Sequence, residues 1–568
     1  MYIFYNMLDI MKIYAYIVVM FIAEIPTRTK SGKISHMCYL LRESYRDGKK
    51  VKSRTIANIT HLSEKEREAL RLALKHKDNL VALDSFENSV KERQGKSVGA
   101  VWLVYAIANR LGIKDALGKS KEGKLALWQV IARTINQGSR TAAVRMAKIH
   151  AAYEILNIKK EFDENDLYKN LAWLSENQKR IEKRLFNVRN KGKTENLFLY
   201  DVTSSYFEGV YNRLSDWDYN RDGKRGKKQV VIGLLCDERG DPLSVEVFNG
   251  NTRDFATISN QIKKTAQEFN CERVTFVGDR GMIKSSQIEE ITDAGFHYIT
   301  ALTKPQIEKL LREGVFQLEL FDTQVCEIEH EEIRYILKRN PQRVKEIAQI
   351  RESKKVSIET LIKKKNTYLY EHKRARVSTA LAEIEGKINK LKISGWLKVE
   401  ADGRRLELKE NREALAEESK LDGCYVIKSD LPKDIDKQII HDRYKDLAKV
   451  EQAFRTCKTI MLELRPWFVR KEKSTRGHAF VVMLSYLITH YLQNAWNNFD
   501  FTVKEILKNL STICSIIIDI KEHSSFQRIP EPLPVLNKFL KAADVKLPQG
   551  IPINKNNVGS NKKKIKAT

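Results

Sequence analysis

The stretch Asn196-Leu-Phe-Leu-Tyr-Asp-Val-Thr-Ser-Ser205 decides the fold class, because an apolar segment here runs directly into a carboxylate. Residues 197–200 are apolar at every position, which is typical of a strand buried on both faces of a sheet. Asp201 stands where this strand is expected to leave the core. A carboxylate there is costly unless a cation, a hydrogen-bond network or a cap compensates it. Asp201 therefore either caps its own turn onto Thr203 or Ser204, the commoner role of such a residue, or belongs to a functional site.

Two further segments place an acid in a similar position. Arg273-Val-Thr-Phe-Val-Gly-Asp279 is a second apolar strand that ends in a carboxylate. Residues 435–462 have a helical pattern in which Leu447, Glu451 and Phe454 share one face. We expect Leu447 and Phe454 to pack and to carry Glu451 into the interior. The recurrence of costly acids in three separate segments favours a functional site.

The composition indicates a globular protein with a polyanionic partner. The chain has 568 residues, with 101 Lys and Arg against 73 Asp and Glu, and a formal net charge of +28. This surplus is spread along the chain, and no basic amphipathic anchor is evident, so nucleic acid is favoured over a membrane surface. The seven cysteines are scattered and never spaced as C-x2-C, which disfavours a disulfide framework and a structural zinc site. We expect a cytoplasmic, nucleoid-associated protein with no membrane partner.

The order of predicted elements is typical of an RNase H-like core in an α/β protein. We expect a mixed five-stranded sheet flanked by helices, interrupted by an α+β insertion domain and preceded by a β-hairpin and a helical module. Residues 1–19 contain no recognisable element, so Met20 is the expected start of the protein. The expected divisions are a doubtful N-terminal extension (1–19), a β-hairpin and helix module (20–97), a helical module able to bind DNA (98–190), the first part of the core (191–302), the insertion domain (303–421), the second part of the core with the Glu451 helix (422–495), and a C-terminal helical segment with a basic tail (496–568).

The three carboxylates suit a divalent-metal site for chemistry on a phosphodiester. Adjacent strands would bring Asp201 and Asp279 together at their carboxyl ends, and Glu451 would reach in from its helix. Such a cluster is self-repelling unless cations bind, and Mg²⁺ prefers oxygen ligands, with Mn²⁺ expected to substitute. Two ions can activate a water or a 3′-hydroxyl and stabilise the leaving oxygen. The alternative for Glu451, an ion pair with Lys458, is disfavoured because seven helical residues span about 10 Å.

Three strings resemble the DDE transposases of bacterial insertion sequences, in particular the large group with the C-terminal signature Y-x2-R-x3-E-x6-K. They are FLYDVTSSYFEG (198–209), VGDRGM (277–282) and YKDLAKVEQAFRTCK (444–458). The resemblance implies that Asp201, Asp279 and Glu451 form a catalytic, metal-binding triad. It also implies that Tyr444 and Lys458 contact DNA phosphate near the cleavage point.

Two arginines are further candidates for contact with DNA. Leu447 stands where the signature has its arginine, so that contact is absent or is made by another residue such as Arg455. Arg280 follows the second aspartate directly and either contacts phosphate or forms a salt bridge with a neighbour.

The preferred interpretation is a DNA transposase. It would bind the terminal inverted repeats of its element, cut at the ends and transfer the 3′ ends to double-stranded target DNA, acting as a homodimer on DNA. A structure-specific, metal-dependent DNA nuclease that cuts without joining is the alternative within the same fold. A catalytically inactive DNA-binding relic is the alternative outside enzyme function, although the complete triad argues against it.

Overall fold

A mixed β-sheet forms the centre of the larger of two compact units, which comprises residues 96–515 and 529–551 within the described part of the chain. The computed structural model describes residues 19–28, 32, 34–47, 50–75, 90–190, 195–209, 211–219, 221–269, 271–458, 462, 464, 467–520 and 524–551.

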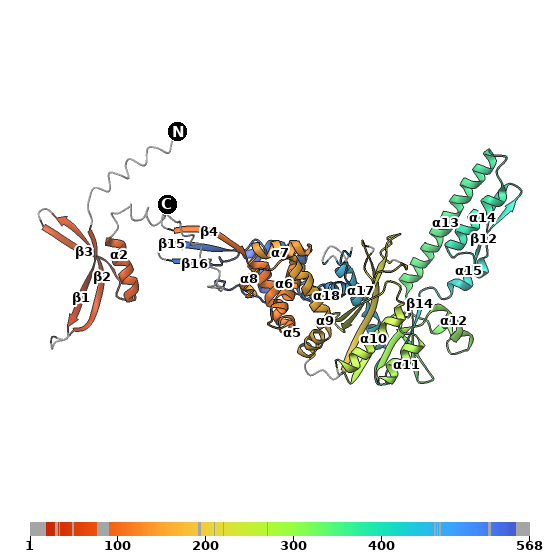
Figure 1. Ribbon diagram of the computed structural model, residues 1–568, viewed down its shortest axis with the longest axis horizontal. Helices are drawn as coiled ribbons and strands as arrows, with labels where there is room; N and C mark the ends of the chain where they lie inside the picture. The colour runs from red at the N-terminus through yellow and green to blue at the C-terminus, as the bar shows by residue number, and fades with distance from the viewer. Residues whose placement is uncertain are drawn as a thin grey trace, which may run out of the picture. The chain divides into compact units, whose positions relative to one another are not determined.

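Eight strands of the described residues form this sheet, in the order β10-β11-β14-β9-β8-β5-β6-β7. Figure 1 labels β14 of this sheet and three helices of the same unit, α10 (Asp254–Gln267), α11 (Ser285–Asp293) and α17 (Leu447–Lys458). The strands β5, β8 and β9 are parallel to one another, and every other neighbouring pair is antiparallel. Their bounds are β5 (Glu195–Tyr206), β6 (Gln229–Asp237), β7 (Pro242–Phe248), β8 (Arg273–Gly278), β9 (His297–Ala301), β10 (Cys326–His330), β11 (Ile333–Arg339) and β14 (Cys424–Ser429).

This sheet is larger than the five-stranded sheet that the sequence predicts. The first five strands follow the expected order, and β14 then pairs with β9 where the sequence resumes its core pattern. The additional strands β10 and β11 come from the region assigned to the insertion domain, yet β11 is hydrogen-bonded to β14 over residues 334–339. Strand pairing across so many intervening residues leaves no local mark in the sequence, so the pattern alone could not assign these strands to the sheet.

The strand β5 is also longer than predicted. We expected the strand to end at Asp201, but its pairing with β6 continues from Phe198 to Tyr206. Asp201 lies opposite Leu234 within this ladder. The polar run of Thr203 and Ser204 looked like a turn, and it forms a strand because the apolar strand β6 supplies backbone partners along its whole length.

Alternate residues of β5 pack into two different cores. Phe198 and Tyr200 belong to a core with side chains of α10 (Asp254–Gln267) and α11 (Ser285–Asp293). Leu199 points to the opposite face and belongs to a core with side chains of α17 (Leu447–Lys458) and α18 (Glu472–Ala495). A strand whose two faces are both covered must be apolar at every position, as residues 197–200 are.

Helices before and after the sheet pack together in the same unit, as the sequence predicts for residues 98–190. The close packing of α18 on α9 depends on Gly477, because a Cβ at this position would lie 2.0 Å from the carbonyl oxygen of Leu171. The bounds of these helices are α4 (Gly99–Arg110), α5 (Ile113–Leu117), α6 (Lys121–Ile135), α7 (Arg140–Ile149), α8 (Ala152–Ile155), α9 (Glu164–Arg189), α19 (Val503–Leu510) and α20 (Pro534–Ala542).

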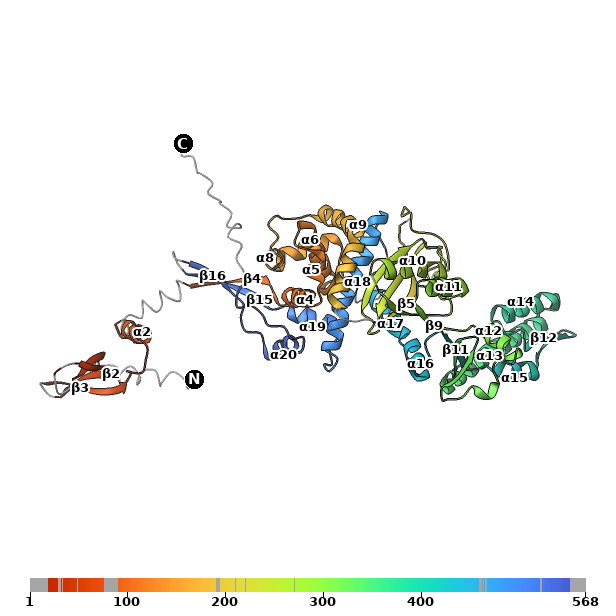
Figure 2. The same ribbon diagram turned by 90° about the horizontal axis from the view of Figure 1, so that it is seen from below.

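A separate small core forms within the region predicted as the insertion. The long helix α13 (Pro341–Glu371) packs beside α14 (Val377–Lys390), and both contact the hairpin of β12 (Leu397–Asp402) and β13 (Arg405–Glu410) (Figure 2). The shorter elements of the same region are α12 (Lys304–Arg312), the 3₁₀ helix η2 (Leu318–Leu320) and α15 (Arg412–Ser419).

The smaller unit falls within residues 1–95 and 516–528. The antiparallel strands β1 (Val19–Arg28), β2 (Ile34–Asp47) and β3 (Lys50–Asn58) form a sheet that contains the predicted hairpin, and α2 (Glu64–Lys75) follows.

The C-terminal segment corrects one prediction. Residues 513–520 were expected to be helical, whereas β15 (Cys514–Ile520) forms a sheet with β16 (Ser524–Arg528) and β4 (Val90–Ser97). β-Branched isoleucines favour an extended backbone once partner strands are present. Of the predicted extension (1–19), only Val19 is described, as the first residue of β1. Residues 552–568 of the predicted C-terminal segment with its basic tail (496–568) lie outside the described residues. In the described part of the chain, no helix has the length and apolar character needed to cross a membrane.

A buried ion-pair network joins α9 to the sheet and to α10. Lys264 Nζ lies 3.1 Å from Glu182 Oε2 and 3.0 Å from Glu246 Oε1, and it donates a 2.8 Å hydrogen bond to Ser244 Oγ. Lys264 and Glu182 are both buried, and burial raises the pKa of Glu182. Removing one partner would leave an uncompensated charge in the interior.

We therefore expect Lys264→Met to destabilise the protein by about 3–5 kcal/mol, measured from the midpoint of chemical denaturation followed by circular dichroism. The double variant Lys264→Met/Glu182→Leu should recover much of this loss, because it removes the charge that the single variant leaves unpaired. A single variant as stable as the unmodified protein would contradict the structural role of the network.

Candidate active site

The pairing of β5 with β8 places two carboxylates side by side. The parallel register ends with Tyr200 opposite Gly278, so the next residues along each strand are Asp201 and Asp279. Adjacent strands lie about 4.8 Å apart, and residues in equivalent register point to the same face. That face is the one occupied by Leu199 of β5, which precedes Asp201 by two residues and belongs to the core beneath α17 and α18.

The helix α17 brings Glu451 to the same face of the sheet, because α17 packs on β5. Its buried residues include Val450, Ala453, Phe454 and Cys457, which form the apolar stripe. Glu451 is exposed at the flank of this stripe. The prediction that Glu451 is carried into the interior was therefore wrong.

The predicted single helix over residues 435–462 is also two helices. The helix α16 (Lys437–Lys445) ends before α17 begins, with Asp446 as its C-terminal cap. Tyr444 and Leu447 consequently belong to different helices. Leu447 is only half-buried, and the stripe that packs is displaced by one residue from the face that the spacing of Leu447 and Phe454 suggested.

The pKa of Asp201 depends on its burial and on the charges of the other two acids. Burial raises the pKa of its carboxyl to about 7, and the charges of Glu451 and Asp279 act in the same direction. The backbone N–H of Val202, which donates a 2.8 Å hydrogen bond to Asp201 Oδ1, and the nearby Arg221 oppose this rise. The structure thus places Asp201 and Asp279 side by side and Glu451 within electrostatic range of Asp201.

Tyr444 and Arg280 lie beside the second aspartate. The Tyr444 hydroxyl donates a 3.2 Å hydrogen bond to Asp279 Oδ1, and burial followed by the Asp279 charge raises the pKa of Tyr444. Asp279, Arg280 and Tyr444 all line one cleft of about 460 Å³, together with the exposed cations Lys304 and Arg343. This cleft leads from the carboxylates to the base of α13 and has the charge to accept phosphate groups.

Lys458, the lysine of the signature, pairs with an acid other than the three proposed carboxylates. Its Nζ lies 3.1 Å from Asp222 Oδ1, and it also donates to the carbonyl oxygen of Ser204. Asp222 is almost inaccessible and accepts a 3.2 Å hydrogen bond from the Tyr206 backbone N–H. Lys458 therefore fastens the end of α17 to β5. Arg455 lies exposed one turn before it.

Arg221 and Asp222 are the residues of this region that the sequence did not identify. Arg221 pairs with Asp254 at 2.6 Å and donates a 2.5 Å hydrogen bond to the carbonyl oxygen of Val202, next to Asp201. The only signal in the sequence is that residues 221–228 form a basic loop. Their position becomes evident only when this loop folds back on β5.

Two aromatic side chains that follow α17 in the sequence belong to the core. Trp467 is 1% exposed and stacks on Phe207, with ring centroids 6.1 Å apart. His478 is buried, contacts the edge of Trp467 and has a pKa well below its ordinary value because of burial and the nearby arginines. Both side chains therefore have structural roles in the core. Arg465, which lies near them in sequence, is outside the described residues.

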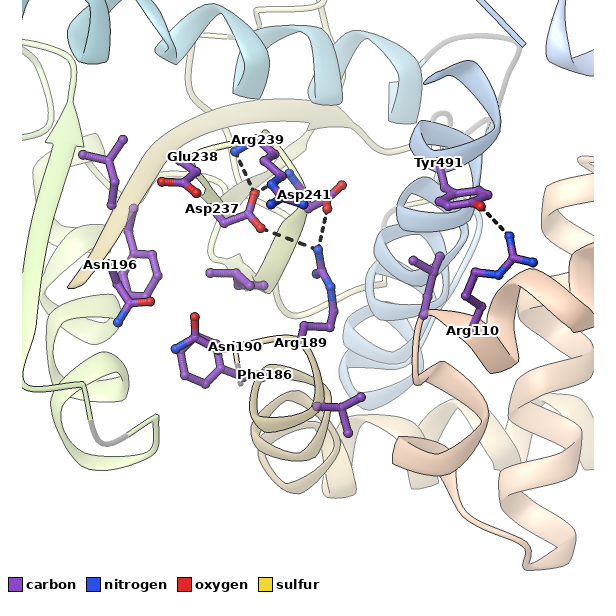
Figure 3. Close-up of a pocket in the computed structure, with 15 residues that line it drawn as sticks. Arg110, Phe186, Arg189, Asn190, Asn196, Asp237, Glu238, Arg239, Asp241 and Tyr491 are labelled. Carbon is purple, nitrogen blue, oxygen red and sulfur yellow. Dashed lines mark hydrogen bonds and ion pairs between the residues drawn. The ribbon is translucent and has the colours of Figure 1, made fainter. Parts of the chain in front are cut away.

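A second pocket, of about 340 Å³, lies at the other end of β5, near Asn196 (Figure 3). Its acids are already compensated, since Arg189 lies 2.5 Å from Asp241 and 3.5 Å from Asp237. His490 Nδ1 is 2.7 Å from the other oxygen of Asp241. This arrangement stabilises the turn between β6 and β7 and is remote along β5 from Asp201.

The donor set at Asp201, Asp279 and Glu451 fits a divalent cation. The ligands are all carboxylate oxygens, which hard cations prefer. Burial, reinforced by repulsion from Glu451 and Asp279, raises the pKa of Asp201, and a bound cation would favour its charged form. Among the described residues, no three His, Cys, Asp or Glu side chains already converge on one point. The exposed side chains of Asp279 and Glu451 have room to rotate toward Asp201.

Two models of known protein families match parts of the chain. Residues 23–83 match the model of the IS1634 family transposase N-terminal domain, and residues 192–488 match that of the transposase DDE domain. DDE transposase domains depend on divalent metal ions. No curated protein matches the chain. One similar solved structure is a piggyBac transposase synaptic complex with hairpin DNA, at 8% identity and a TM-score of 0.34, covering 68% of this chain and 69% of that one.

The pKa of Asp201 predicts how metal-free protein responds to pH. Its folded-state pKa of about 7 exceeds the ordinary value of 3.8, so the folded state holds more protons than the unfolded state between these values. Stability must therefore fall as pH rises from about 4 to about 7 and then level off. At about pH 8, Asp201→Asn should be more stable than the unmodified protein by at most a few kcal/mol and should therefore melt at a higher temperature. Near pH 4 this difference in stability should vanish.

The measurement is a series of thermal melts across pH in the presence of a chelator. Asp222→Asn is a useful comparison, because it removes a buried carboxylate that is paired with Lys458 and should destabilise the protein at about pH 8. Equal melting temperatures for Asp201→Asn and the unmodified protein at all pH values would contradict the raised pKa of Asp201.

Proposed function

We propose, on the premise that the chain belongs to the DDE transposases of insertion sequences, that it binds the terminal inverted repeats of its element, cleaves at the ends and joins the 3′ ends to target DNA. The observation that carries the proposal is the register of β5 and β8, which sets Asp201 beside Asp279, together with the packing of the Glu451 helix α17 on β5. The parallel strands β5, β8 and β9, with antiparallel β6 and β7 and helices on both faces, support an RNase H-like core for this chemistry.

Asp201, Asp279 and Glu451 are the residues proposed to hold Mg²⁺, with Mn²⁺ as a substitute. Bound there, two such ions would activate a water or a 3′-hydroxyl and stabilise the leaving oxygen of the phosphodiester. Asp201 is half-buried and accepts a hydrogen bond from the Val202 N–H, so it would supply the rigid ligand. Glu451, exposed on α17, is free to adjust.

The surrounding residues position the carboxylates and the DNA. Tyr444 orients Asp279 through its hydrogen bond. Arg280, with Lys304 and Arg343 in the same cleft, would neutralise phosphates that flank the cleaved bond. Arg455 is exposed on α17 and is a candidate for a further phosphate contact.

Lys458 would act through position more than through direct contact with DNA. Its ion pair with the buried Asp222 holds α17, and hence Glu451, against β5. As long as Lys458 pairs with Asp222, it would hold α17 in place of making the phosphate contact that the signature lysine implies.

A nuclease that cuts and does not join has the same site requirements. An assay with labelled element ends and a target plasmid separates the possibilities, because a transposase gives joined product, a nuclease gives cut product and an inactive relic gives only a shifted band.

We expect Asp201→Ala, Asp279→Ala and Glu451→Ala each to lower the cleavage rate by at least about a thousand-fold in Mg²⁺, since each removes a ligand of the reacting centre. End binding, followed by electrophoretic mobility shift, should stay within a few-fold. The matched control is Gln452→Ala, the exposed neighbour of Glu451 on α17, which should cleave at the normal rate. Undiminished cleavage by any one alanine variant would remove that residue from the site.

We further propose that the active species is a dimer on DNA. Joining two element ends to nearby target positions needs two triads, and each chain supplies one, so two-fold symmetry is the simplest arrangement.

Mixtures of active and Glu451→Ala chains test this assembly on paired-end substrates. Concerted joining of both ends should fall roughly as the square of the active fraction, because both sites must work. Cleavage of single ends should fall linearly and serves as the internal control. A linear fall in concerted joining would mean that one chain processes both ends.

A further inference from the structure

A second cleft lies in the same unit, between the first turns of α9 and α18. It has a volume of about 660 Å³ and is lined by Tyr168 and Lys169 of α9, by the segment 468–471, and by Ser474 of α18. None of the carboxylates of the proposed active site lines it. The backbone just before this segment is tied to the catalytic strand, since Trp467 N–H donates a 3.3 Å hydrogen bond to Tyr206 O at the end of β5.

Two aromatic side chains on this cleft face solvent. Phe468 is 72% exposed and Tyr168 is 45% exposed, whereas the adjacent Trp467 is 1% exposed. Because Phe468 is mostly exposed, it contributes little to the packing of the core, in contrast to Trp467. An aromatic face that remains open beside cations is suited to stacking on a nucleobase.

The charge on the cleft is positive and uncompensated. Lys169, Arg470 and Lys471 are exposed, and no ion pair engages them within the described residues. The neighbouring acids have other partners. Asp163 and Asp166 cap the start of α9 reciprocally, Glu164 accepts a hydrogen bond from Thr141, and Glu472 pairs with Arg476 at 3.0 Å.

A buried cation, Arg140, lies within electrostatic range of Tyr168, although it does not line the cleft. Arg140 is 6% exposed, its Nη2 is 2.8 Å from His478 Nδ1, and its Nε has no hydrogen-bond partner. No carboxylate among the described residues pairs with it. Burial, reinforced by nearby Arg133, lowers its pKa to about 9, and the Tyr168 phenol acts on it in the opposite sense. A buried guanidinium without a counter-ion is costly, and a bound anion would offset that cost.

We propose that this cleft binds a DNA strand that carries an unpaired nucleobase, with the base stacked on Phe468 and Tyr168 and the phosphates on Lys169, Arg470 and Lys471. The inference rests on the proposed function, because both the proposed active site and this cleft would bind DNA. The polypeptide chain covers about 20 Å from Asp201 of β5 to Phe207, which pairs with Trp467. This length corresponds to roughly six nucleotides of a DNA strand. The cleft would therefore hold the strand some distance from the cleavage point and keep the duplex open on that side.

The test measures binding alone, in the presence of a chelator, so that it does not depend on cleavage. The probes are a short blunt duplex and the same duplex extended by a few unpaired nucleotides, one of them a fluorescent adenine analogue. The unmodified protein should bind the extended duplex roughly ten-fold more tightly and quench the analogue, as expected when a base stacks on an aromatic side chain. Phe468→Ala should abolish both effects, and Phe468→Trp should retain them.

The matched control is Tyr370→Ala, which removes an aromatic side chain of 87% exposure from α13, away from the cleft, and should bind like the unmodified protein. The double variant Arg470→Gln/Lys471→Gln should flatten the plot of log affinity against log salt by about 0.7 for each lost contact on a single strand.

Two outcomes would overturn the inference. The first is equal affinity of the unmodified protein for the two probes, and the second is a Phe468→Ala variant that still prefers and quenches the extended probe. Both differ from failure of the proposed function, which would appear as an absence of cleavage and joining in Mg²⁺ whatever the result with these probes.

Discussion

The parallel register of β5 and β8 is the constraint on which the proposed active site depends. Because Tyr200 lies opposite Gly278, the two aspartates that follow them become neighbours on one face of the sheet. A shift of this register by one residue would turn one carboxylate to the face covered by α10 and α11. Two separate cores, one on each face of β5, oppose such a shift, since Leu199 and Phe198 would have to exchange environments.

The second requirement is a helix that crosses this face without burying its acid. The apolar stripe of α17 packs on the sheet, and Glu451 lies at the edge of the stripe, close enough to raise the pKa of Asp201 and exposed enough to meet a substrate. The pair of Lys458 and Asp222 fastens one end of the helix, and the hydrogen bond from Tyr444 to Asp279 ties the preceding helix to the sheet. The site is thus positioned by contacts that are not themselves part of the chemistry.

Positive charge is distributed in a way that suits a long, charged partner. The formal net charge of +28 is not confined to one segment, and exposed cations line the cleft beside Asp279 as well as the cleft between α9 and α18. Both clefts combine cations with tyrosine side chains. A duplex that contacts both would be held at two places along its length, which fixes its direction relative to the carboxylates.

The sequence by itself predicted the three acids that are proposed for the site, and it determined the order of the first five strands, the helical character of residues 98–190 and the family. These features depend on local periodicity and on motifs, which are read within a few residues of one another. The tertiary structure alone decided that the sheet has eight strands in the described residues, that residues 514–520 form a strand, that Glu451 is exposed and that Lys458 pairs with Asp222. It also decided which of two adjacent aromatics, Trp467 or Phe468, is available to a ligand. Each of these outcomes depends on a partner distant in sequence, because which face packs and which charge is paired are settled by long-range contacts that local periodicity does not encode.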